Sequence, residues 1–84
     1  MERISWFRPI DYEILSYFGA CDMTATPKVI ATNINYDRQY TQKRLVRLVE
    51  ADLLIRDSGL YALSDRGRDY LDGDLDASDL DSRP

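Results

Sequence analysis

Between residues 9 and 18 the apolar positions repeat with the period of an α-helix. They lie at i, i+4, i+7 and i+8, which places them along one side of the helix: Ile10, Ile14, Tyr17 and Phe18. Pro9 stands at the favoured first helical position, and Gly19 is a suitable stop. The pattern therefore predicts a first helix over about residues 9 to 18.

A second, shorter helix is indicated mainly by its start signal. Thr26 can cap a helix with its hydroxyl, and Pro27 follows at the first helical position. The apolar face of this segment consists of Val29, Ile30 and Ile34. We expect the helix over about residues 26 to 33.

A tight turn and a long helix are predicted next. Asparagine tolerates positive φ better than other non-glycine residues, and Asn35 lies in the turn, while Asp37 is a cap candidate for the following helix. Residues 38 to 51 contain neither glycine nor proline. The expected buried side of this third helix is formed by Thr41, Leu45, Leu48 and Val49.

Two short runs after this helix, residues 53 to 56 and 60 to 63, are rich in strand-forming side chains. Between them lies Asp57-Ser58-Gly59, which predicts a three-residue hairpin connection with glycine at its end. A small β-hairpin is therefore expected.

A final helix is predicted from Asp65 to about Leu71, with Ser64 as its cap. Gly67 weakens this helix unless the small residue is needed for close packing. We place the folded domain at residues 1–71. Residues 72–84 are rich in aspartate and poor in large apolar side chains, so they are expected to form a flexible acidic tail.

Helix, short helix, tight turn, long helix and hairpin follow one another in the order of a winged helix-turn-helix. The expected fold class is α+β and mostly helical, with three helices, a two-stranded wing hairpin and a short C-terminal helix. The long helix is expected to lie across the first helix with one side exposed. On or near that side lie Gln39, Tyr40, Lys43, Val46 and Arg47.

Charge is distributed unevenly along the chain. The formal net charge of −4 comes from the tail, because residues 72–84 hold five aspartates and one arginine, whereas residues 1–71 hold ten acids and ten bases. Residues 24–47 carry a local charge of +4, from five bases and one acid. A basic segment on the second helix of a helix-turn-helix favours a nucleic-acid partner.

The side chains of the long helix have chemistry suited to double-stranded DNA. Arginine and lysine donate to guanine and glutamine bonds adenine, chiefly from the N-terminal half of a recognition helix. Base contacts are therefore predicted from Arg38, Gln39, Gln42 and Lys43. Phosphate contacts are predicted from Thr26, Lys28, Tyr40, Arg44 and Arg47. Arg56, beside the hairpin tip, is a further candidate for a backbone or minor-groove contact.

Other functions have less support in the sequence. There is no histidine and a single cysteine, Cys21, so the usual zinc sites, an internal disulfide and the commonest general base are missing. We expect no enzyme activity, cofactor, metal or small-molecule ligand. The chain lacks a long apolar run and a signal-peptide pattern, which predicts a cytoplasmic protein with no membrane partner. A winged-helix protein-protein interaction module without DNA binding is the alternative.

Over roughly residues 6 to 76 the chain also follows the pattern of one known family, and a set of residues carries the likeness. It comprises Thr26-Pro27, Tyr40, Arg44-Leu45, Leu48, Leu53-Leu54, Tyr61, Leu63-Ser64, Gly67, Tyr70-Leu71 and Gly73. In these positions the chain resembles the small haloarchaeal winged-helix proteins related to the repressor of a PhiH-type temperate phage. The resemblance implies a repressor-like transcriptional regulator that binds DNA. Asp52 stands where glycine commonly ends the long helix, which suggests a differently closed C-cap, and Ser64 replaces threonine.

The preference for aspartate among the acids and arginine among the bases is typical of salt-loving archaea, so a halophilic protein is expected. DNA binding through about five phosphates would lose roughly six orders of magnitude in affinity between about 0.1 M and about 3 M salt. We therefore predict a homodimer that reads two half-sites, with base contacts and shape complementarity providing most of the affinity. Candidate dimer surfaces are Trp6, Phe7 and the last helix.

Overall fold

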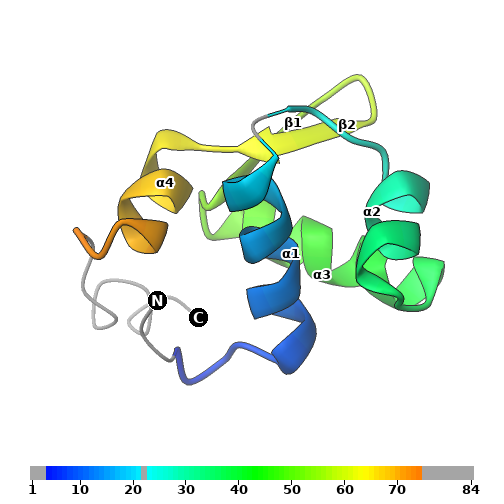
Figure 1. The fold of residues 1–84 in the computed structure, drawn as a ribbon, viewed down its shortest axis with the longest axis horizontal. Helices are drawn as coiled ribbons and strands as arrows, with labels where there is room; N and C mark the ends of the chain where they lie inside the picture. The colour runs from blue at the N-terminus through cyan, green and yellow to red at the C-terminus, as the bar shows by residue number, and fades with distance from the viewer. Residues whose placement is uncertain (1–3, 22, 75–84) are drawn as a thin grey trace.

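The computed structural model describes residues 4–21 and 23–74 (Figure 1). Its elements are α1 Pro9–Ala20, α2 Pro27–Ile34, α3 Arg38–Glu50, β1 Leu54–Asp57, β2 Leu60–Leu63 and α4 Asp65–Leu71. In Figure 1 the hairpin lies along one edge, α2 and α4 lie at opposite ends, and α1 lies between them in front of α3. The order and arrangement are those of a winged helix-turn-helix, mostly helical with one antiparallel hairpin, as predicted.

The first helix begins at Pro9 as expected but extends beyond Gly19. The N–H of Cys21 still donates to the Tyr17 carbonyl at 2.9 Å, so the hydrogen-bond ladder continues to Ala20. The predicted stop at Gly19 is therefore wrong.

The starts of α2 and α3, and the turn between the two helices, are formed by the residues that the sequence indicated. The Thr26 hydroxyl oxygen accepts from Val29 N–H at 3.3 Å and caps α2. Asn35 has φ 61° and ψ 48°, the left-handed conformation that the turn requires. The Asp37 carboxylate accepts from Tyr40 N–H at 2.9 Å and caps α3. Both helices keep their predicted places, with ends shifted by one residue.

The C-terminus of α3 closes through Asp52, which has φ 64°. Its N–H donates to the Val49 carbonyl at 2.9 Å, and Leu53 N–H donates to the Leu48 carbonyl at 3.0 Å. These two bonds form a Schellman motif, the same closure that glycine commonly provides. The expectation of a different C-cap is wrong, because aspartate itself adopts the left-handed conformation.

The hairpin is tighter than predicted. Asp57 pairs with Leu60, so the connection is the two-residue turn Ser58-Gly59 and not a three-residue loop. Its φ values of 52° and 82° are those of a type I′ turn, whose twist suits two antiparallel strands. A bridge between Ala25 and Tyr61 places the start of α2 beside β2.

The last helix is capped by Ser64, whose hydroxyl oxygen accepts from Gly67 N–H at 2.9 Å. A Cβ on Gly67 would stand 2.2 Å from the Leu53 carbonyl oxygen, so glycine permits close packing. The described chain continues past residue 71 to Asp74, which donates its N–H to the Asp69 carbonyl at 2.8 Å. The rest of the predicted acidic tail, residues 75–84, lies outside the described residues.

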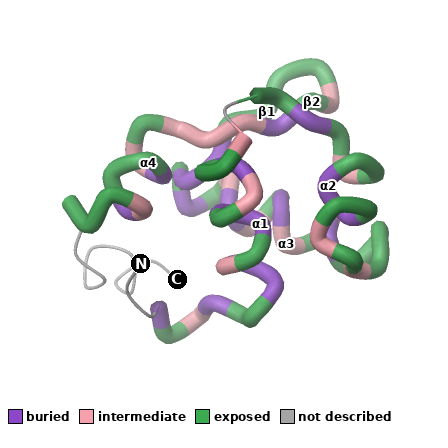
Figure 2. Tube along the Cα trace, viewed as in Figure 1, coloured by how far each residue is buried: buried purple, intermediate pink, exposed green. Residues whose placement is uncertain are grey.

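The core lies where α1, α3 and the inner side of the hairpin meet (Figure 2). Its largest fully buried side chains include Phe18, Leu45, Leu48, Tyr61 and Tyr70. Phe7 is 8% exposed and packs edge-on to the Tyr70 ring. Phe7 and Tyr70 of α4 are therefore parts of the core and are withdrawn as dimer contacts. Among the described residues, no helix is long and apolar enough to cross a membrane.

Candidate nucleic-acid interface

Helix α3 has a buried side and an opposite exposed side. Thr41, Leu45 and Leu48 are fully buried, whereas Val49, predicted with them, is only half-buried. We call the exposed side the outward row. It consists of Gln39, Lys43, Val46 and Glu50, which recur at i, i+4, i+7 and i+11. The sequence placed the first three of these on the exposed side, and the structure confirms it.

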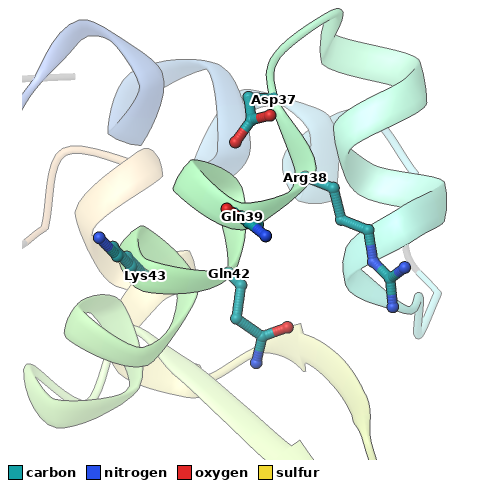
Figure 3. A pocket seen from close by; sticks show the side chains of 5 residues that line it. All are labelled: Asp37, Arg38, Gln39, Gln42 and Lys43. Atoms are coloured by element: carbon teal, nitrogen blue, oxygen red, sulfur yellow. The ribbon is translucent and has the colours of Figure 1, made fainter.

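The N-terminal half of α3 borders an open hollow of about 790 Å³. Its lining residues are Asp37, Arg38, Gln39, Gln42 and Lys43 (Figure 3). Figure 3 shows that their side chains spread in different directions, with Arg38 extending away from the helix. The structure thus brings all four predicted base-contacting residues together at one end of α3.

Gln42 lies at the edge of this group. Its amide nitrogen donates to the Tyr61 hydroxyl at 3.4 Å, and its side chain is half-buried between α3 and the hairpin. Gln39 and Lys43 are exposed and belong to the outward row. The side chains of Gln39 and Lys43 are therefore more accessible than that of Gln42 to a partner that approaches the exposed side of α3.

Arg44 does not occupy the position predicted for it. Its Nε and Nη2 donate to the two carboxylate oxygens of Asp11 at 2.9 and 2.6 Å, and Nη2 also reaches the Trp6 carbonyl at 3.4 Å. The hydrogen bond with Asp11 raises the pKa of Arg44, although burial of the guanidinium opposes this effect. Asp11 is fully buried, so the guanidinium neutralises a charge that would otherwise be costly. We withdraw Arg44 from the phosphate contacts.

Arg47 is also turned partly towards the body of the protein. Its guanidinium carbon lies 4.1 Å from the centroid of the Trp6 ring, a cation-π arrangement, and the residue is half-buried. Arg47 is therefore less exposed than its place on or near the exposed side predicted. It lies beside the outward row, on the same flank as Arg44.

The remaining predicted contacts come from α2, α3 and the hairpin. Thr26 and Lys28 are exposed in the first turn of α2 or just before it. Tyr40 is 40% exposed on α3. Arg56 is exposed on β1, with its guanidinium carbon 5.8 Å from the Tyr61 ring centroid. The Ala25–Tyr61 bridge links the α2 start to the hairpin that carries Arg56.

Sequence reasoning missed Asp11 as the partner of Arg44. The signal was present, because Asp11 falls at i−3 from Ile14 and i−4 from Leu15, two fully buried residues of α1. A carboxylate on that side requires a counter-charge from another element. The pattern could not show that this element was α3.

The exposed outward row lies on the second helix of a winged helix-turn-helix, the helix with which DNA-binding regulators of this kind meet a duplex. Together with the family, this supports a DNA-binding regulator in general. The chain belongs to the winged helix-turn-helix phage repressor family, whose model matches residues 1–83. It is similar to the PhiH1 repressor-like protein from Haloarcula marismortui, with a TM-score of 0.78 and 28% sequence identity. The likeness covers 90% of this chain and 89% of that chain. No protein with curated annotation matches it. These findings confirm the resemblance.

Proposed function

We propose that the protein is a sequence-specific, repressor-like transcriptional regulator that binds double-stranded DNA with α3 in the major groove. The observation that carries the proposal is the exposure of Gln39 and Lys43 on the outward row, at the N-terminal half of the second helix of the helix-turn-helix. The family is a regulatory one, which is consistent with this function.

Base recognition is assigned first to the exposed polar groups at the start of α3. Lys43 and Arg38 can donate to guanine O6 and N7, and Gln39 can bond adenine N6 and N7. Gln42 also contacts a base when its amide gives up the hydrogen bond to the Tyr61 hydroxyl and bonds the base instead.

Phosphate contacts are assigned to groups around this helix. Lys28 and the Thr26 hydroxyl lie at the N-terminus of α2, where the helix dipole also favours an anion. Tyr40, Arg47 and Arg56 complete the set. Arg47 reaches a phosphate while its guanidinium stacks on Trp6.

We further propose a cytoplasmic, halophilic homodimer that reads two half-sites. The small number of exposed cations supports this, because few phosphate contacts give one protomer little affinity at high salt. Trp6, half-buried at the edge of the core, and the exposed side of α4 remain the candidate dimer surfaces. Light scattering in concentrated KCl, with and without operator-length DNA, measures the assembly. A monomer in both samples would overturn the dimer.

The test of DNA binding is a selection of bound sequences from random duplexes in concentrated KCl. We expect one preferred sequence with two-fold symmetry. The Lys43→Ala variant should then lose about 1–3 kcal/mol of binding and relax the preference at one base pair. Arg8→Ala, the removal of an exposed cation just before α1, is the control and should bind like wild type. If no duplex is retained by folded protein, the interaction-module alternative is favoured instead.

A further inference from the structure

One apolar residue interrupts the outward row of α3. Val46 is 40% exposed, and its neighbours in the row are Lys43 and Glu50. The adjacent Leu45 is fully buried, so the core of α3 does not depend on Val46. The side chain lies on the same stripe as Gln39, the residue assigned to base recognition.

The contacts of α3 with the rest of the protein determine which side of the helix can meet a groove. On one flank Arg44 is bonded to Asp11, and on the other Gln42 is bonded to Tyr61. Side chains on both flanks of α3 thus bond to the rest of the protein. The outward row lies between these flanks, on the side of α3 that can enter the groove. Val46 therefore points in the same direction as Lys43.

Val46 also lies within reach along the helix axis. It is three residues beyond Lys43, which corresponds to about 4.5 Å at the helical rise per residue. Successive base pairs are about 3.4 Å apart, so Val46 lies about one base pair from Lys43. Glu50 is the next residue of the row, and its carboxylate faces electrostatic repulsion from phosphates. Val46 is thus the last residue of the row with chemistry suited to a base edge.

The thymine 5-methyl is the apolar group that base pairs present in the major groove. We propose that Val46 is a specificity-determining residue that packs against a thymine methyl next to the base pair read by Lys43. This inference rests on the proposed function. A short side chain is sufficient, because the methyl group projects from the base edge into the groove.

The experiment replaces each thymine of one half-site of the selected DNA, in turn, with deoxyuridine, which lacks the methyl group. At one position the substitution should weaken binding by wild-type protein about fourfold, the value of one buried methyl group. The Val46→Ala variant should bind the unmodified DNA about fourfold or more weakly and show no further loss at that position. Val29→Ala is the matched control, since Val29 is 45% exposed on α2, and it should keep the deoxyuridine penalty.

The outcomes separate this inference from the proposed function. If the selection returns no preferred sequence, the proposed function fails and the inference fails with it. If a preferred sequence is bound but no deoxyuridine penalty disappears in Val46→Ala, the methyl contact is overturned while the regulator remains. A penalty that also disappears in Val29→Ala would equally overturn it, because the effect would then not be specific to α3.

Discussion

Replacing Arg44 with methionine removes the guanidinium that joins α3 to α1 and keeps most of the apolar stem. In the wild-type protein the buried Asp11 carboxylate accepts from Arg44 at 2.9 and 2.6 Å and from Arg8 N–H at 2.7 Å. The variant keeps the last of these bonds and leaves the carboxylate buried without the guanidinium. Removing one partner of a buried ion pair costs about 3–5 kcal/mol, against a total stability of about 5–15 kcal/mol for a typical domain.

The effect is measured by urea and thermal unfolding. Each kcal/mol corresponds to about 4–8 °C for a domain of this size, so the midpoint should fall by at least about 12 °C. Arg38→Met removes an exposed arginine from the same helix and should change stability by no more than about 0.5 kcal/mol. Asp11→Asn in the Arg44→Met background removes the unpaired charge, keeps an acceptor for Arg8 N–H, and should recover part of the loss.

Two results would refute this reasoning. The first is an Arg44→Met protein whose unfolding free energy matches that of Arg38→Met. The second is a deficit that disappears in concentrated KCl, because salt screens exposed ion pairs strongly and buried ones weakly. Either result would mean that solvent reaches the Asp11–Arg44 pair.

Three further changes test the caps, the packing and the phosphate contacts. Asp52→Gly should raise the unfolding free energy by about 0.5–1 kcal/mol, because φ 64° is strained for aspartate; a decrease would contradict this. Gly67→Ala should destabilise the protein by about 1–3 kcal/mol in urea unfolding, since the new Cβ would meet the Leu53 carbonyl, and an increase would refute the close packing. In binding titrations against KCl, Lys28→Ala should reduce the magnitude of the salt slope by about 0.9 per protomer, whereas Arg8→Ala, which removes an exposed cation not assigned to DNA, should leave it unchanged.

The helix starts and the central turn could be predicted because their signals are local. Thr26, Asp37 and Ser64 each cap the helix that directly follows, with a bond to a backbone N–H three residues away. Asn35 likewise adopts its left-handed conformation within a few residues of both helices that it joins. Signals of this range are visible in the sequence without knowledge of the tertiary structure.

The ends of helices and strands were less predictable, because the residues there are compatible with more than one closure. Gly19 is a residue type that often ends a helix, yet α1 continues to Ala20. Aspartate is common in turns, yet Asp57 pairs with Leu60 in the hairpin, because the two-residue turn Ser58-Gly59 is sufficient to reverse the chain. Packing of the flanking residues selects between such alternatives, and a single sequence does not display it.

The candidate site was predicted well where exposure follows from helical periodicity and poorly where a distant partner intervenes. Gln39 and Lys43 are exposed because they lie opposite the buried side of α3. Arg44 lies nearer to that side, and its partner Asp11 is 33 residues away along the chain. Arg47 is partly covered by Trp6, which lies farther away still along the chain, so helical position alone overstated how exposed these two arginines are.

The orientation of Arg44 bears on how the proposed regulator would work in salt. Of the four cations of α3, Arg38, Lys43 and Arg47 are assigned to DNA, whereas Arg44 is neutralised by Asp11. Fewer cations then remain to release counterions from DNA, which lowers the salt dependence as well as the non-specific affinity. Discrimination must instead come from contacts that salt does not screen, namely hydrogen bonds and apolar contacts to base edges. Arg44, which is withdrawn from the DNA side, instead holds α3 in the orientation that those contacts require.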